Sequence, residues 1–114
     1  MKAGDAMYQL HFIHINDDAL TLTKSKQDTI HLFLGNWINP SAQKSISIQT
    51  GVDTNHNQYQ ILQIDTEHQR IKLTSEEDPQ LVYILDYEDA NHVFIQTSVK
   101  NSYGTSRPIR YEKF

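Results

Sequence analysis

Short segments in which apolar and polar side chains alternate run along most of the chain, and turn-forming residues separate them. Clear cases are residues 44–50, with Ile46 and Ile48 on one face, and residues 70–74, with Ile71 and Leu73 on one face. A period of two is typical of half-buried strands, and no long apolar stripe recurs at the helical period of about 3.6 residues. About eight or nine such segments, spaced about 8–12 residues apart, predict a sandwich or barrel.

The short links between these segments predict that sequence neighbours pair antiparallel. The first pair is predicted as a hairpin of residues 8–15 and 19–24, joined by a turn at residues 16–18. Because an open sheet leaves edges that invite aggregation, we expect the sheet to close. The sequence therefore predicts an all-β fold, an antiparallel meander of eight to nine strands closing into a small barrel. It forms one domain over residues 1–114, with residues 1–6 as a flexible N-terminal stub.

Two stretches depart from simple alternation. In residues 58–65, Tyr59 and Ile61 share one parity while Leu62 and Ile64 share the other, which indicates either a β-bulge near Ile61 and Leu62 or a strand covered on both faces. Residues 28–34 fit either a short helical turn capped by Asp28 or a further strand, and the pattern leaves both open.

Composition narrows the function classes. The chain has no cysteine, which excludes disulfides, thiolate nucleophiles and Cys-zinc sites. Its formal net charge of −4 makes nucleic acid a poor partner, since phosphate binding needs a clustered positive face. No apolar run approaches the roughly 20 residues that span a membrane. We expect a monomer at a bacterial cell exterior, exported or lipid-anchored, while a cytoplasmic location stays open.

Gly35 and Trp37 form a Gly-x-Trp sequence in the first third of the chain. This sequence resembles the motif of the lipocalin and wider calycin families, small antiparallel barrels in which a tryptophan plugs one end. The resemblance implies that an arginine of the last strand, Arg110 or else Arg107, packs across the indole. The motif here follows a predicted hairpin, whereas in that family it lies on the first strand. Trp37 is equally well explained as an ordinary core aromatic after a turn glycine, and both explanations predict its burial.

No catalytic or metal-binding pattern stands out. The six histidines are scattered, and His11 and His14, three apart on a predicted strand, point to opposite faces. The acidic clusters at residues 76–78 and 86–89 lack the spacing of a calcium loop and indicate solvated turns. We therefore expect no catalytic residues, no metal, no cofactor and no enzymatic activity.

Three hypotheses of function remain. The first is a non-enzymatic binding protein that holds a small apolar ligand in the barrel, lined by Tyr59, Tyr83, Phe94 and Tyr111. The alternative is a filled barrel that acts as a protein-interaction module, of the inhibitor or immunity type, through residues 51–57 and 101–107. The third is a small hydrolase-type enzyme, which would need histidine or glutamate side chains to converge.

Overall fold

The computed structural model describes residues 9–16, 23–51, 58–99 and 107–114, and the predicted stub at residues 1–6 lies outside them. These residues form eight strands and one short helix. In chain order the elements are β1 (Gln9–Asn16), α1 (Lys24–His31), β2 (Gly35–Asn39), β3 (Lys44–Thr50), β4 (Gln58–Asp65), β5 (Arg70–Ser75), β6 (Leu81–Asp89), β7 (His92–Val99) and β8 (Ile109–Lys113).

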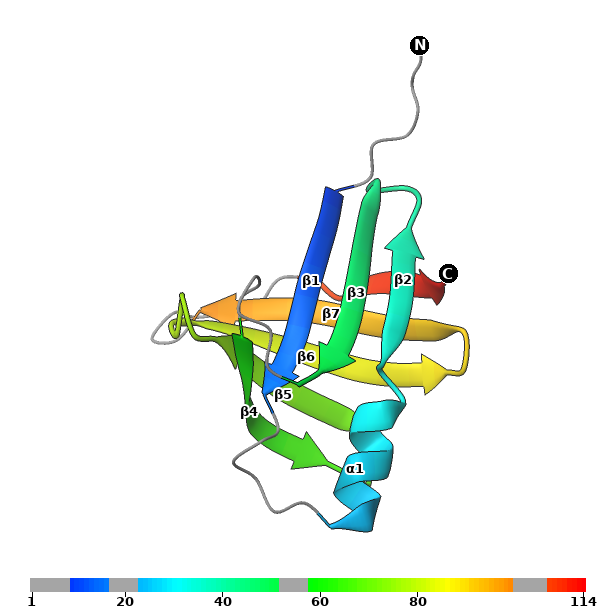
Figure 1. The fold of residues 1–114 in the computed structure, drawn as a ribbon. Helices are drawn as coiled ribbons and strands as arrows, with labels where there is room; N and C mark the ends of the chain where they lie inside the picture. The colour runs from blue at the N-terminus through cyan, green and yellow to red at the C-terminus, as the bar shows by residue number, and fades with distance from the viewer. Residues whose placement is uncertain (1–8, 17–22, 52–57, 100–106) are drawn as a thin grey trace.

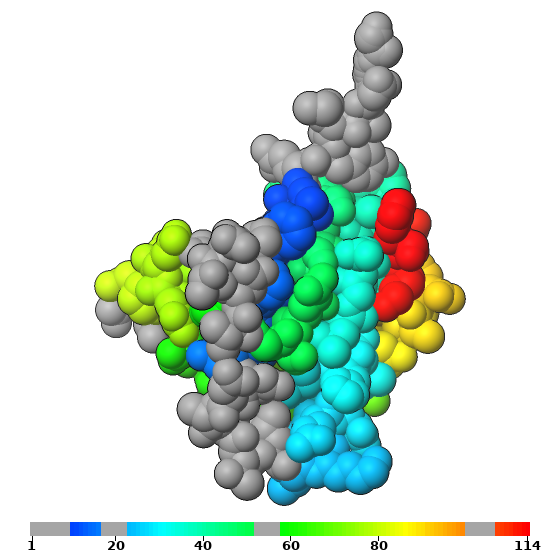
Figure 2. All heavy atoms as spheres, in the orientation of Figure 1, coloured from blue at the N-terminus to red at the C-terminus, as the bar shows by residue number. Residues whose placement is uncertain are grey.

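The strands close into a barrel in the order β1-β3-β2-β8-β7-β6-β5-β4, which confirms the predicted closed, all-β fold. From β4 to β8 each strand pairs antiparallel with the next, as a meander. Figure 1 shows β1, β3 and β2 running across β6 and β7, which lie behind them. In the space-filling view of Figure 2 the same three strands lie side by side on one face, followed by β8.

The first strand pairs differently from the prediction. β1 lies parallel to both of its neighbours, with Ile13 opposite Ile48 on β3 and Ile15 opposite Tyr59 on β4. The predicted hairpin of residues 8–15 and 19–24 is wrong at its second strand, because Lys24 begins a helix; residues 17–22 lie outside the described residues. Parallel neighbours need a crossover connection, and α1 lies within the connection that leads from β1 to β2 and β3.

The helix begins earlier than the sequence indicated. Thr23, not Asp28, is its N-cap, and the Thr23 hydroxyl accepts a hydrogen bond from the Lys26 backbone N–H at 3.3 Å. Asp28 lies inside the helix, where its carboxylate pairs with Lys24. The buried side of the helix presents Thr29 and Ile30, and the helix packs on β4 and β5.

The phase change in residues 58–65 is a β-bulge, as one of its two interpretations predicted. The pairing of β4 with β5 shifts between Ile61 and Gln63, and the extra residue, Leu62, is 46% exposed. The bulge bends β4 where α1 covers the adjoining barrel end.

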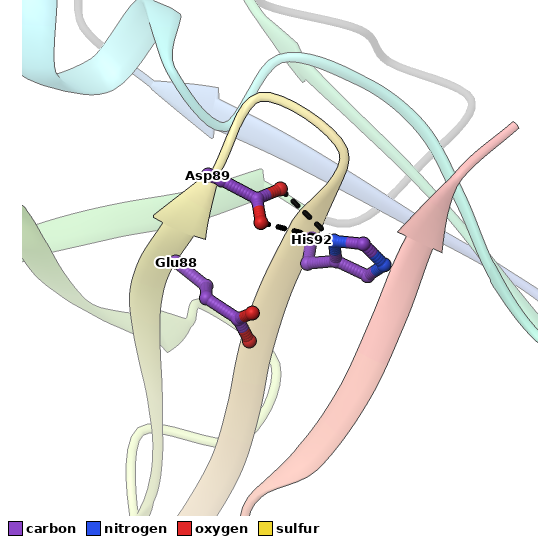
Figure 3. A group of neighbouring side chains, drawn as sticks. All are labelled: Glu88, Asp89 and His92. Carbon is purple, nitrogen blue, oxygen red and sulfur yellow. Dashed lines mark hydrogen bonds and ion pairs between the residues drawn. The ribbon is translucent and has the colours of Figure 1, made fainter.

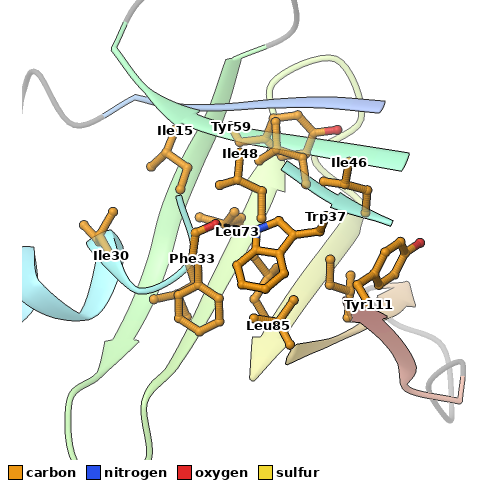
Figure 4. Packing of buried hydrophobic residues seen from close by; sticks show 14 residues of the cluster. Ile15, Ile30, Phe33, Trp37, Ile46, Ile48, Tyr59, Leu73, Leu85 and Tyr111 are labelled. Atoms are coloured by element: carbon orange, nitrogen blue, oxygen red, sulfur yellow. Dashed lines mark hydrogen bonds between the residues drawn. The ribbon is translucent and has the colours of Figure 1, made fainter. Parts of the chain in front are cut away.

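One continuous core fills the interior. Trp37 and Phe33 lie at its centre, fully buried, with aliphatic side chains from β1, β3, β5, β6 and β7 around them (Figure 4). The helix found in the described part of the chain is too short and too polar to cross a membrane.

Candidate functional site

The indole of Trp37 is buried in the core, as both explanations of the Gly-x-Trp sequence predicted. Trp37 is 0% exposed, and its Nε1–H donates to the carbonyl oxygen of Phe33 at 2.9 Å. The Lys113 ammonium lies 4.5 Å from the centre of the indole ring and donates to the Leu34 carbonyl oxygen at 2.9 Å. A cation over the face of an indole ring makes an attractive contact. The side chain of Lys113 therefore links β8 to β2, in addition to the backbone ladder between these strands.

Gly35 makes room for that cation. Its φ of +127° is a conformation that residues with a side chain rarely adopt. A Cβ at this position would also overlap Nζ of Lys113. The glycine of the Gly-x-Trp sequence therefore serves both the backbone turn and the approach of Lys113.

The prediction that Arg110 packs across the indole is wrong. The Arg110 guanidinium forms two hydrogen bonds with the Glu88 carboxylate, at 3.0 and 2.7 Å, on the outer surface. Side chains alternate between the two faces of a strand, and Tyr111 of β8 points into the core. Arg110 therefore faces outward, whereas Lys113 approaches the end of the barrel where β8 meets β2. Arg107 is exposed and precedes β8.

The four predicted ligand-lining residues do not form one group. Phe94 lies between the buried Val93 and Ile95, so it faces outward, opposite Asp86 and Arg110 in the ladders of β7. Its predicted place in the interior is therefore wrong. Tyr111 does lie in the core, beside Trp37, as Figure 4 shows.

Tyr59 and Tyr83 do come together, and they meet His11. The Tyr59 hydroxyl and Nε2 of His11 are 2.6 Å apart. The Tyr83 ring stands edge-on to both, with its centroid 5.4 Å from that of Tyr59 and 5.7 Å from that of His11. We call these three residues the rim cluster, because they lie where β4 begins and β7 ends, away from α1.

Burial sets the electrostatics of the rim cluster. Desolvation, and then the positive charge of Lys44, lower the pKa of His11 below its usual value. Desolvation, followed by Tyr83, raises the pKa of Tyr59 well above its usual value. A neutral imidazole and a neutral phenol therefore share this hydrogen bond at neutral pH. Two neutral groups in this arrangement form a structural hydrogen bond rather than an acid-base pair poised near pH 7.

Only part of the rim cluster is predictable from the sequence. Tyr59 and Tyr83 are among the amphipathic aromatics predicted to line a pocket, whereas no role is predicted for His11. The alternation places His11 on the same face of the strand as Ile13 and Ile15, which are buried. Its partners were not visible, because they depend on how β1 is inserted between β3 and β4.

A second group of polar side chains lies at the turn between β6 and β7. Ligand atoms of Glu88, Asp89 and His92 all lie within 4.8 Å of one another. Figure 3 shows the three side chains side by side at this turn. Nδ1 of His92 is 2.9 Å from the Asp89 carboxylate, whereas Glu88 is held by Arg110. This arrangement consists of a hydrogen bond between His92 and Asp89 and an ion pair between Arg110 and Glu88, so a guanidinium already neutralises one of the carboxylates.

The two segments predicted to contact a protein partner, residues 51–57 and 101–107, lie largely outside the described residues. Their flanking residues show where they join the barrel. Gly51 follows β3 and donates its N–H to the Ile15 carbonyl oxygen, while Gln58 begins β4. Val99 ends β7, opposite Leu81 of β6. Both segments therefore join the barrel near the rim cluster.

Comparison with known proteins identifies a family. The sequence pattern of the family described as Staphostatin B matches residues 9–113. Staphostatin B of Staphylococcus aureus strain COL is 55% identical over 107 residues, which cover 94% of this chain and 98% of the relative. The protein of that name from strain N315 shows the same identity and coverage.

A solved structure agrees with the fold. The solution structure of staphostatin A from Staphylococcus aureus, described as one of a class of cysteine proteinase inhibitors, superposes with a TM-score of 0.62. It is 17% identical, and the match covers 97% of this chain and 98% of that one. The resemblance to lipocalins thus holds for a small closed barrel but not for the family. The chain belongs to the Staphostatin B family.

Proposed function

We propose that this protein is an inhibitor of a cysteine protease, acting by binding the protease as a folded barrel. The main support is the 55% identity to staphostatin B along almost the whole of both chains. The likeness in fold to staphostatin A, described as a cysteine proteinase inhibitor, adds to it. Among the three hypotheses from the sequence, these comparisons favour the filled-barrel inhibitor over the apolar-ligand binder and the hydrolase.

The packing of the interior supports the same choice. Fourteen buried hydrophobic residues form one cluster through the barrel, and Trp37 and Phe33 occupy its centre. A barrel of eight strands is only just wide enough for side chains to fill it. The packed interior therefore makes the barrel rigid, and a protease would be bound by the outer surface and the connecting segments.

The contact surface that we propose includes residues 51–57 and 101–107. They join β3 to β4 and β7 to β8, and the start of β4 and the end of β7 lie on the same side of the barrel (Figure 1). One segment that enters β4 and one that leaves β7 on that side offer a protease one continuous surface. An inhibitor of this kind binds without a large loss of conformational freedom, because the scaffold is already ordered.

Inhibition assays test the proposal. The purified protein is titrated against cysteine proteases of Staphylococcus aureus, the organism of the relatives, with papain for breadth and trypsin as a serine-protease control. Fluorogenic peptide hydrolysis reports the activity. We expect one staphylococcal cysteine protease to lose activity at an equimolar ratio, with Kd below about 1 μM, because protease–inhibitor complexes are among the tightest of their size. Trypsin should keep its activity. Unchanged hydrolysis by every cysteine protease at a large excess of this protein would refute the proposal.

Segment replacements locate the surface. Residues 101–106 are replaced by a glycine-serine sequence of equal length, and residues 52–57 are replaced in the same way in a second variant. Each variant should retain the indole emission of a folded barrel and lose inhibition. A matched replacement of the turn at residues 66–68, at the opposite end of the meander, should leave inhibition unchanged.

A further inference from the structure

Three rings from three different strands meet inside the barrel in the rim cluster. His11 comes from β1, Tyr59 from β4 and Tyr83 from β6. In the barrel order β6 does not neighbour β1 or β4, because β5 and β4 lie between β6 and β1. The contacts of the Tyr83 ring with His11 and Tyr59, whose centroids lie 5.7 and 5.4 Å away, therefore join parts of the wall that no backbone ladder joins.

The backbone seam beside the rim cluster is short. Among the described residues, β1 pairs with β4 through His14, Ile15 and Asn16, whereas it pairs with β3 along seven residues. His11 lies three residues before the first of those pairs. Its bond to the Tyr59 hydroxyl, at 2.6 Å, extends the contact between β1 and β4 beyond the end of the ladder.

The rim cluster also adjoins the strand ends beside the proposed contact segments. Tyr59 is the second residue of β4, and β4 begins directly after residues 52–57. Tyr83 pairs with Thr97, two residues before the end of β7 at Val99, after which residues 100–106 follow. The contact between the Tyr59 and Tyr83 rings therefore links the start of β4 to β6, and the ladder pair of Tyr83 with Thr97 links β6 to the last part of β7.

We infer that His11, Tyr59 and Tyr83 are positioning residues for inhibition, which fix the start of β4 relative to the end of β7. This inference rests on the proposed function. A contact surface in two pieces binds tightly only if the two pieces keep their relative position, since ordering them on binding costs affinity. Loosening the rim cluster should therefore weaken inhibition while the Trp37 side of the core stays folded.

Matched tyrosine variants test this role. Tyr59→Phe removes one hydroxyl from the rim cluster, and Tyr111→Phe removes one hydroxyl from an equally buried tyrosine on the other side of Trp37 (Figure 4). We expect Tyr59→Phe to raise the inhibition constant about tenfold, as expected for a lost buried hydrogen bond, and Tyr111→Phe to change it by less than about twofold.

Substitutions of His11 supply a rescue test. His11→Phe keeps a ring but offers Tyr59 no acceptor, so it should weaken inhibition as much as Tyr59→Phe does. His11→Gln keeps a side-chain acceptor and should recover part of the affinity. A merely structural contribution of ring packing would give the opposite order, with His11→Phe the milder change.

Amide hydrogen exchange separates positioning from general destabilisation, and it does not depend on the protease. In Tyr59→Phe, amides at residues 58–60 and 96–99 should exchange faster, while those at residues 93–95 keep their wild-type protection. Uniformly faster exchange, or inhibition equal to that of the wild type, would overturn the inference and leave the proposed function standing. A wild-type protein that inhibits none of the proteases would overturn the proposed function itself.

Discussion

Gly35→Ala should destabilise the barrel through two separable effects. The backbone at this position has φ of +127°, and placing a residue with a Cβ in such a region costs about 1–3 kcal/mol. The new Cβ would also displace the Lys113 ammonium, a flexible group that can swing away. Lys113 would then lose its contact with the Trp37 ring, about 0.5–1 kcal/mol, and its hydrogen bond to Leu34, about 0.5–1.5 kcal/mol. We expect a total loss of about 2–5 kcal/mol.

Gly51→Ala is the matched control. Gly51 has φ of +106°, but nothing lies within 4 Å of the position that a Cβ would take. This variant should therefore show the backbone cost alone, and it should destabilise the protein by about 1–2 kcal/mol less than Gly35→Ala does. In a protein that already carries Lys113→Ala, Gly35→Ala should lower the free energy of unfolding only as much as Gly51→Ala does. The contacts of Lys113 that the new Cβ would displace are already absent there.

Urea unfolding followed by the emission of the single tryptophan measures these differences. Emission should shift to longer wavelength on unfolding, because Trp37 is fully buried in the folded barrel. Equal losses for the two glycine variants, or a cost of Gly35→Ala that does not depend on Lys113, would refute the account of the Gly-x-Trp sequence given above.

Three further outcomes follow from the electrostatics. Arg110→Ala should change the urea midpoint only slightly, because the pair with Glu88 lies on the surface, and it should leave the emission of Trp37 unchanged. A large emission shift in that variant would instead indicate that Arg110 contacts the indole. Burial lowers the pKa of His11 in the folded protein, so on acidification the unfolded chain binds a proton at this residue first. The stability of the wild type should therefore fall between pH 7 and about pH 5, relative to that of His11→Gln. A difference in urea midpoints that stays constant over this range would contradict the prediction. The hydrogen bond with Asp65 raises the pKa of His68 in the folded protein. The contribution of this pair to the free energy of unfolding is therefore present below about pH 6.5 and is lost as the pH rises through the pKa of the folded protein. His68→Asn should lower the urea midpoint at about pH 5.5 but not at about pH 8.

The alternation of apolar and polar residues predicted the features that depend on a single strand. Alternation placed Ile46, Ile48, Ile71 and Leu73 in the core, and the phase change marked the bulge after Ile61. Each of these features depends on the side-chain period of a single strand, which the sequence displays directly.

Pairing partners could not be predicted in the same way. The alternation of β1 fits a strand of either direction, and only the closed barrel decides that it lies parallel to β3 and β4. The identity of the cation over Trp37 depends on the same long-range information. Arg110 and Lys113 both lie in the last strand, and the register of β8 against β2, which places Lys113 opposite Trp37, selects the lysine.

The proposed function could not be predicted from the sequence for a different reason. An inhibitor breaks no bond of its own, so it needs no nucleophile, no metal and no pair of matched acid and base that a motif could display. What it needs is a surface whose shape is fixed before binding, and that shape depends on packing beneath the surface. The rim cluster illustrates the point: a histidine and two tyrosines carry no recognisable motif, yet they join strand ends that the backbone ladders leave apart. In a protein of this class, the residues to substitute first are therefore those that hold the scaffold beneath the contact segments, and Tyr59 is the most direct of them.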